Sequence, residues 1–212
     1  MPKTLTYLFD PLCGWCYGAS AAVAAAAATP GVVLRLLPTG LFADAGARAM
    51  SDDFAAYAWA NDQRIGQVTG QPFSAAYRVQ VLASRTQRFD SGPATRALTA
   101  VALTAPAQEL AALQAIQHAR FVLGQDVTQP ATLTAVLRRL GLADAVTQLA
   151  QTGADLQVAT HARTQAGQAL MRTVGARGVP TFVLDADTTP RILHSATAHE
   201  HPQAWAAQLA AT

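Results

Sequence analysis

Two short apolar runs near the N-terminus flank an alanine-rich stretch, and this pattern predicts a strand, a helix and a second strand. Residues 4–9 combine aromatic and branched side chains and end at an aspartate-proline pair, as expected for a buried strand. A helix is expected over about 13–28, because alanine favours helices and a proline-glycine pair follows. Residues 32–37 carry one polar side chain, Arg35, which favours a strand in the interior of a sheet. A unit of this length implies a right-handed crossover and parallel strands.

After residue 40 the character of the chain changes, because helical patterns follow one another with no strand pattern between them. Glycine and proline separate the segments, and several starts carry acidic residues or proline in the first turn. The expected helices span 51–67, 73–85, 94–104, 108–123, 131–140 and 143–151. The sequence therefore predicts an all-helical insertion in an α/β chain.

Beyond residue 152 the α/β pattern resumes. A helix expected over about 155–174 leads to Val179-Pro180. Two strands, at 181–185 and 191–195, are joined by a polar turn whose spacing suits an antiparallel hairpin, and a helix over 200–211 follows. The predicted domains are a discontinuous α/β domain and a helical insertion domain, with the ranges 1–40 plus 153–212 and 41–152, respectively.

Composition and charge narrow the function classes. The chain has 212 residues, 51% of them hydrophobic, and a formal net charge of +2. This charge gives no reason to expect nucleic acid or an anionic membrane as a partner. The apolar start ends at Asp10 without a cleavage site, so a strand is expected there rather than a signal peptide, and the alanine run is too short to cross a bilayer. We expect a cytoplasmic protein; the sequence leaves its oligomeric state open.

Cys13 and Cys16 are the only cysteines, and they form a Cys-X-X-Cys motif at the expected start of the first helix. A structural zinc site commonly takes four ligands, but there is no second cysteine pair and the histidines lack finger spacing, so no metal is expected. A purely structural disulfide across so short a loop would constrain the unfolded chain very little. The motif therefore indicates reversible dithiol-disulfide chemistry, which needs no cofactor.

The order of the two cysteines predicts their roles. At the first turn of a helix, unpaired backbone N–H groups and the helix dipole favour a thiolate, so Cys13 is the expected nucleophile. Cys16, one turn later, is the expected resolving thiol. Between them, Gly14 leaves the Cys13 sulfur open to a bulky disulfide, and Trp15 offers an apolar face to a substrate.

Two motifs carry a resemblance to a known family. They are Asp10-Pro11-Leu12-Cys13-Gly14-Trp15-Cys16-Tyr17-Gly18 and Gly175-Ala176-Arg177-Gly178-Val179-Pro180-Thr181-Phe182-Val183. With the order of elements around them, they resemble the thioredoxin fold with the helical insertion of the DsbA-like family, and the first is similar to the signature of its cytoplasmic FrnE-like branch. The resemblance implies a cis Val179-Pro180 bond lying against the cysteine pair. The backbone of Val179 is then expected to pair with an extended substrate.

The expected function is that of a thiol-disulfide oxidoreductase, similar to protein disulfide oxidoreductases and isomerases, acting on protein or small-molecule thiols and disulfides. Glutathione is a candidate co-substrate. Trp15 stands where the strongest oxidants of the family carry histidine and thioredoxins carry proline, so the redox direction stays open.

Two alternatives remain. The layout also resembles kappa-class glutathione transferases and 2-hydroxychromene-2-carboxylate isomerases, which generally place serine where Cys13 stands and need no resolving thiol such as Cys16. A redox-sensing, partner-binding module is the other alternative.

Two further groups of polar residues are expected to lie at the surface. His199-Glu200-His201 could suggest a metal site, but histidines at a helix start are usually solvated. Arg163, Arg172 and Arg177 could recognise glutathione carboxylates only if they converged on the site, and we expect them to be solvated.

Overall fold

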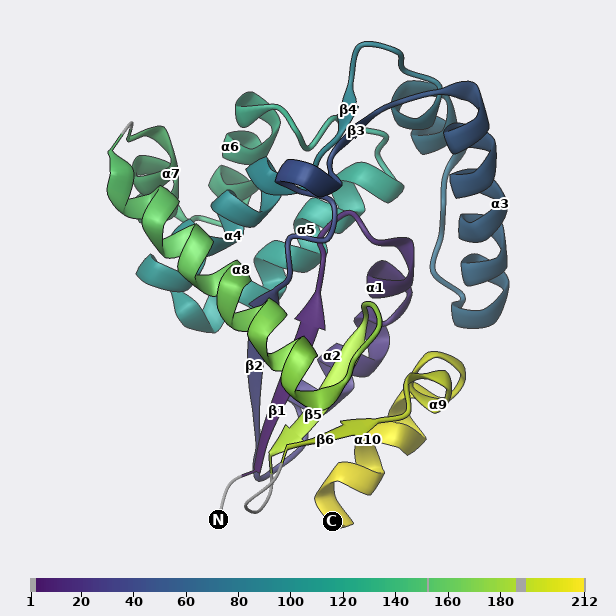
Figure 1. Cartoon of the computed structure of the whole chain (residues 1–212), viewed down its shortest axis with the longest axis vertical. Coiled ribbons are helices and arrows are strands. Elements are labelled where there is room, and N and C mark those ends of the chain that lie inside the picture. Colours follow the sequence, from purple (N-terminus) through teal and green to yellow (C-terminus); the bar gives the residue numbers. More distant parts are fainter. Residues whose placement is uncertain (1–2, 152, 186–189, 212) are drawn as a thin grey trace.

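A four-stranded mixed sheet lies at the centre of the protein (Figure 1). The computed structural model describes residues 3–151, 153–185 and 190–211. In spatial order the strands are β2 (Val32–Pro38), β1 (Lys3–Phe9), β5 (Thr181–Asp185) and β6 (Arg191–Leu193). The predicted parallel pairing of β1 with β2 and antiparallel pairing of β5 with β6 are both confirmed. The predicted turn at 186–189 lies outside the described residues.

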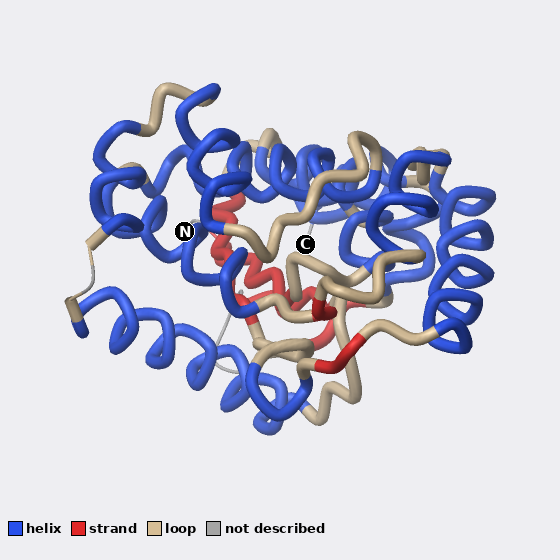
Figure 2. The backbone as a smooth tube through the Cα atoms, turned by 90° about the horizontal axis from the view of Figure 1, so that it is seen from above, coloured by secondary structure: helices blue, strands red, loops and turns tan. Residues whose placement is uncertain are grey.

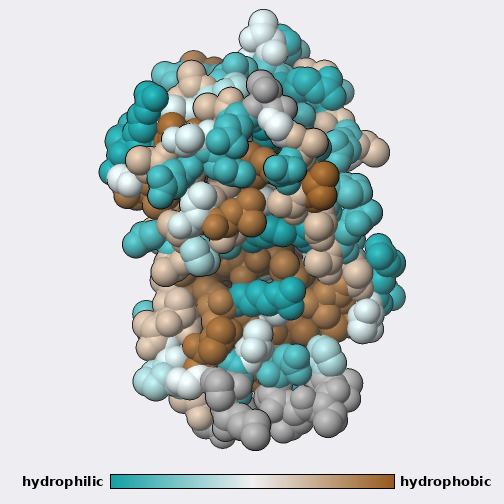
Figure 3. Space-filling model, turned by 90° about the vertical axis from the view of Figure 1, so that its left-hand side faces the viewer, coloured by the Kyte–Doolittle hydropathy of each residue, from teal (hydrophilic) through white to brown (hydrophobic). Residues whose placement is uncertain are grey.

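Strand β2 lies at the edge of the sheet, so the prediction of an interior strand was wrong. Val33 is 51% exposed and Arg35 is also exposed, whereas Leu36 and Leu37 at the carboxyl end are buried. A groove of about 720 Å³ runs beside β2. Figure 3 shows a band of hydrophobic residues on this side of the molecule. An apolar run does not by itself distinguish an edge strand from a central one.

Side chains alternate between the two faces of β1, and each face has its own core. Tyr7 and Phe9 belong to the larger core, to which α2 (Ser20–Ala27) and α10 (Pro202–Ala211) also contribute. Leu8 faces the other side, where it packs in a small cluster with residues of α8 (Ala154–Val174). In Figure 1, α8 accordingly crosses in front of the sheet and α2 lies behind it.

The predicted helix over 13–28 is divided into α1 (Gly14–Gly18) and α2, with Ala19 between them. The alanine-rich sequence gives no signal for this break, which lies beside a contact with α3 (Asp52–Thr69). A Cβ atom on Gly18 would lie 2.8 Å from Ile65 Cγ2 of α3, so α1 approaches that helix more closely than a side chain would permit.

The predicted helix over 200–211 corresponds to α10, and the shorter helix that precedes it was not predicted, because the expected strand over 191–195 ends already at Leu193. Helix α9 (Ser195–Glu200) ends at His201, whose φ and ψ are −137° and 65°, and α10 begins at Pro202. A residue that precedes proline is disfavoured in the helical region, which explains the break.

The insertion is mainly helical, as predicted, but it also contains a short two-stranded sheet. Strands β3 (Arg48–Ala49) and β4 (Arg88–Phe89) pair antiparallel, so the expectation of no strand in this block was wrong. Two-residue strands leave no periodic signal in the sequence. Besides α3, the insertion contains a π-helical segment (Tyr77–Leu82), α4 (Gly92–Thr104), α5 (Glu109–Phe121), α6 (Pro130–Arg139) and α7 (Ala143–Ala150).

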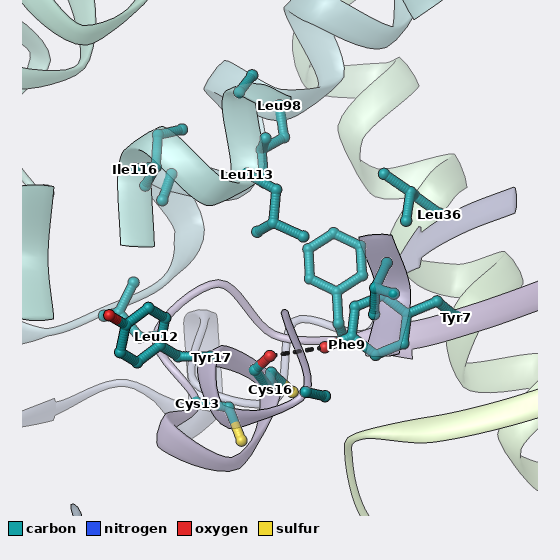
Figure 4. Packing of buried hydrophobic residues seen from close by; sticks show 14 of the residues in the cluster. Tyr7, Phe9, Leu12, Cys13, Cys16, Tyr17, Leu36, Leu98, Leu113 and Ile116 are labelled. Carbon is teal, nitrogen blue, oxygen red and sulfur yellow. Dashed lines mark hydrogen bonds between the residues drawn. The ribbon is translucent and has the colours of Figure 1, made fainter. Parts of the chain in front are cut away.

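The larger core continues from the sheet into the insertion. Leu98 of α4 and Leu113 of α5 belong to the same buried cluster as Phe9, and Figure 4 shows Leu113 pointing at the Phe9 ring. Seen from above, helices surround the strands (Figure 2). The division into two domains stays a prediction. None of the helices in the described part of the chain combines the length and hydrophobicity that crossing a bilayer requires.

Candidate active site

The cysteine pair lies where β1 gives way to α1. Cys13 is the N-cap residue of α1, with an extended backbone, and its N–H donates to the Asp10 carbonyl at 3.1 Å. Both cysteines are free thiols; Cys13 is 7% exposed and Cys16 is 1% exposed. Figure 4 shows the Cys13 sulfur pointing away from the packed interior. Of the two sulfurs, that of Cys13 is therefore better placed to meet a substrate.

The loop between α8 and β5 brings the second predicted motif to Cys13. The Val179-Pro180 peptide bond is cis. The Cys13 thiol donates to the Val179 carbonyl, with 3.6 Å between sulfur and oxygen. Val179 and Pro180 are both half-buried. The structure thus places the predicted nucleophile beside the two residues predicted to hold the substrate chain, although they lie far apart in sequence.

Cys16 is enclosed. Burial raises the pKa of its thiol well above the usual value, and the hydrogen bond and charge of Cys13 raise this pKa further. The Tyr7 hydroxyl donates to the Cys16 carbonyl at 2.9 Å (Figure 4). Cys16 is therefore a neutral thiol at neutral pH. Because a sulfur in a mixed disulfide carries neither charge nor proton, the contributions from Cys13 end once it bonds to a substrate, and Cys16 then ionises more readily.

Asp10 ties the cysteine loop to the insertion. Its carboxylate is fully buried and accepts hydrogen bonds from Leu12 N at 2.9 Å, Phe42 N at 3.1 Å and Ser91 Oγ at 2.7 Å. Burial raises the pKa of Asp10, while these bonds and the charge of Arg120 oppose the rise. The sequence analysis noted Asp10 only as part of the motif; its partners lie in distant segments.

Asp62 of α3 lies against Gly14, the first of the two residues between the cysteines. A Cβ atom on Gly14 would lie 2.3 Å from Asp62 Oδ1, so only glycine fits there without displacing the carboxyl group. The other carboxyl oxygen, Oδ2, accepts a hydrogen bond from the Tyr77 hydroxyl at 2.9 Å. Burial raises the pKa of Asp62 to about 7, against the opposing effects of Tyr77 and Arg120. Sequence reasoning missed Asp62, because nothing in the motif points to the insertion.

A buried guanidinium group stands near both carboxyl groups. Arg120 is 1% exposed, and its positive charge lowers the pKa values of Asp10 and Asp62. The guanidinium lies over aromatic rings, those of Tyr77, Phe89 and Phe121. One arginine thus offsets part of the cost of burying two acids behind the cysteine motif.

His199 was predicted to be a surface residue, and this was wrong. Its side chain is buried, and its Nε2 atom lies 3.1 Å from the carbonyl oxygen of Trp15. His201, two residues on, is exposed. In the ranges that the structure describes, no group of three histidine, cysteine or acidic side chains could hold a metal ion. Helix α9 therefore contributes to the surroundings of the cysteine motif.

Arg163 is not solvated, contrary to prediction. It forms an ion pair with Glu109 and donates to the carbonyl of Leu36 at 3.1 Å, so it joins α8 to α5 and β2. Arg172 and Arg177 are exposed, as expected. Arg163 therefore stabilises the packing of these elements and is already occupied by partners within the protein.

The first cysteine of a Cys-X-X-Cys motif, held against a cis-proline loop on a four-stranded mixed sheet, defines the class: the chain is a thioredoxin-fold thiol-disulfide oxidoreductase. More particularly, it belongs to the family of DSBA-like thioredoxin domains, whose family model matches residues 4–200. The expected fold and enzyme class are thereby confirmed. Comparison with curated protein sequences gives no match.

Solved structures agree with this assignment. The chain is similar to the cytosolic disulfide reductase DsbM from Pseudomonas aeruginosa, with 33% identity, a TM-score of 0.87, and coverage of 97% of this chain and 96% of that chain. A structure of DsbM with GSH gives 31% identity, a TM-score of 0.85 and the same coverage. A putative protein disulfide isomerase from Nitrosomonas europaea, at 23% identity, a TM-score of 0.78 and 99% coverage of each chain, shares the fold.

Proposed function

We propose that this protein is a cytoplasmic disulfide reductase of the FrnE-like type that draws its electrons from glutathione. The observation that carries the proposal is the similarity, over nearly the whole of both chains, to a cytosolic disulfide reductase whose structure has also been determined with GSH. A lone cysteine pair used for catalysis also suits a reducing compartment. The enzyme itself needs no bound cofactor, and glutathione is its co-substrate.

The reaction begins on the reduced enzyme. The Cys13 thiolate attacks one sulfur of a substrate disulfide, forms a mixed disulfide and releases the other substrate sulfur as a thiolate. Cys16 then loses its proton and attacks the Cys13 sulfur, which releases the second substrate thiolate and leaves a Cys13–Cys16 disulfide. The rise in the pKa of Cys16 that is due to Cys13 disappears in the mixed disulfide, so resolution follows capture.

Two glutathione molecules return the enzyme to its reduced form. The first attacks the enzyme disulfide at Cys13 and forms a glutathione mixed disulfide. The second attacks this intermediate and leaves as oxidised glutathione. Each turnover thus converts one substrate disulfide and two glutathione thiols into two substrate thiols and one glutathione disulfide.

The substrate chain lies between the loop at Val179 and the indole of Trp15. The backbone of Val179 pairs with an extended segment of the substrate, and Pro180 has no N–H that would compete for an acceptor. The half-buried Trp15 supplies an apolar surface.

The test is the redox equilibrium of the cysteine pair in a glutathione series, read by mass shift after thiol alkylation. A reductase should have a potential between about −200 and −270 mV, in the range of glutaredoxins and thioredoxin. A potential near −120 mV, as for DsbA, would overturn the proposed direction. With oxidised glutathione, Cys16→Ser should accumulate one glutathione on Cys13, and Cys13→Ser should accumulate none.

The alternatives give different results. A glutathione transferase or isomerase would bind glutathione saturably without thiol exchange. A redox sensor would be oxidised once and would not turn over. A protein disulfide isomerase would rearrange scrambled disulfides without net consumption of glutathione.

A further inference from the structure

We infer that His199 is a positioning residue of the active site, which holds both the backbone and the indole ring of Trp15 and so shapes the surface that meets the substrate. The inference rests on the proposed role of Trp15 in substrate binding. It assigns a task to a residue outside both sequence motifs, brought to the site by α9.

One imidazole contacts Trp15 in two ways. Nε2 lies 3.1 Å from the Trp15 carbonyl oxygen, and since a carbonyl can only accept, Nε2 carries the hydrogen. The two rings also meet edge to face, with centroids 5.1 Å apart and planes inclined at 72°. The first contact restrains the backbone between the cysteines, and the second restrains the orientation of the indole.

The hydrogen bond from His199 lies next to the point where the first helix is interrupted. The same Trp15 carbonyl accepts the N–H of Ala19 at 3.1 Å, and Ala19 is the residue at which the helix divides into α1 and α2. His199 therefore adds a second donor to a short, interrupted helix that has few hydrogen bonds of its own.

The dipeptide between the cysteines is consequently held from two sides. Gly14 lies against Asp62 of α3, and Trp15 lies against His199 of α9. His199 is 6% exposed, so its ring has little room to move, whereas Trp15 keeps part of its surface in solvent. A buried imidazole thus fixes a partly exposed indole beside Cys13. A fixed surface lowers the ordering cost of bringing the substrate disulfide to the thiolate.

Three substitutions separate the two contacts. His199→Gln keeps an N–H donor and loses the ring, His199→Phe keeps a ring and loses the donor, and His199→Ala loses both. His201→Ala is the matched control, because this histidine is exposed and lies two residues away. Glutathione-dependent reduction of insulin disulfides gives kcat and KM for each variant.

We expect His199→Ala to lower kcat/KM by about tenfold, mainly through KM, because it removes a hydrogen bond and an aromatic contact. Gln and Phe at this position should each recover part of the loss, and His201→Ala should match the wild type. Trp15 fluorescence should shift to longer wavelength in His199→Ala, and this shift should be absent when Trp15 is replaced by phenylalanine.

A double-mutant cycle decides whether His199 acts through Trp15. In a Trp15→Ala background the ring contact is already lost but the backbone carbonyl remains, so His199→Ala should cost no more there than His199→Phe, which loses only the hydrogen bond, costs in the wild type. A full additional loss there, or an unchanged kcat/KM in the single variant, would overturn the inference. If the wild type itself fails to reduce insulin disulfides with glutathione, the proposed function fails instead, and the fluorescence shift still reports whether His199 holds Trp15.

Discussion

Replacing Asp62 by asparagine should remove a loss of stability that the wild-type protein suffers as pH rises. The pKa of this carboxyl is raised by burial from 3.8 to about 7 in the folded protein. Between these values the folded protein holds a proton that the unfolded chain has released, so unfolding is favoured progressively as pH increases. The stabilisation that protonated Asp62 gives the folded protein is therefore fully present below about pH 3.8 and is lost progressively between pH 3.8 and about pH 7. Above about pH 7 no further stability is lost through this group.

The magnitude follows from the same values. At about 1.4 kcal/mol for each pKa unit, the whole rise corresponds to roughly 4 kcal/mol. The part between pH 5 and pH 8 is about 3 kcal/mol, because the window ends near pH 7. Asparagine has nearly the same shape, and its carbonyl can still accept the hydrogen bond from the Tyr77 hydroxyl.

Urea unfolding at pH 5 and pH 8 measures the effect. The free energy of unfolding of the wild type should fall by about 3 kcal/mol more than that of Asp62→Asn over this interval. Other buried carboxyl groups with raised pKa values, those of Asp10 and Glu109, contribute equally to both proteins and cancel in the difference. Asp53→Asn, an exposed site on the same helix, should follow the wild type. Parallel pH curves for wild type and Asp62→Asn would refute the reasoning.

Three further substitutions test two contacts at the site and the ion pair that joins α8 to α5. Gly14→Ala should lower the free energy of unfolding by about 1–3 kcal/mol, because its Cβ would collide with Asp62 Oδ1, and an equal effect in an Asp62→Ala background would contradict this cause. Ser91→Ala removes the 2.7 Å hydrogen bond to the buried Asp10 carboxylate and should cost about 1–3 kcal/mol in urea unfolding; an unchanged midpoint would mean that the bond is unimportant. Glu109→Gln breaks the ion pair with Arg163 and should lower the free energy of unfolding by about 2–3 kcal/mol. Adding Arg163→Met should restore part of this stability, as measured by calorimetry, whereas purely additive effects in the double variant would argue against coupling.

The sequence by itself determined the chemistry and most of the elements. Cys13 and Cys16 are close in the chain, so their spacing and their place at a helix start already indicated dithiol-disulfide exchange. Strands β1 and β5 and helices α3 to α8 follow from local periodicity and stop signals, which are short-range properties. Val179-Pro180 was identified through its resemblance to a family motif, which is a local stretch of sequence.

Only the tertiary structure decided which residues surround the cysteines. Asp62, Ser91 and His199 reach the site from separate segments, and no spacing in the chain encodes these contacts. The division of the first helix at Ala19 was likewise seen only in the structure, because an alanine-rich sequence favours an unbroken helix. Local patterns specify elements because they act within a few residues, whereas burial and pKa depend on which elements the fold brings together.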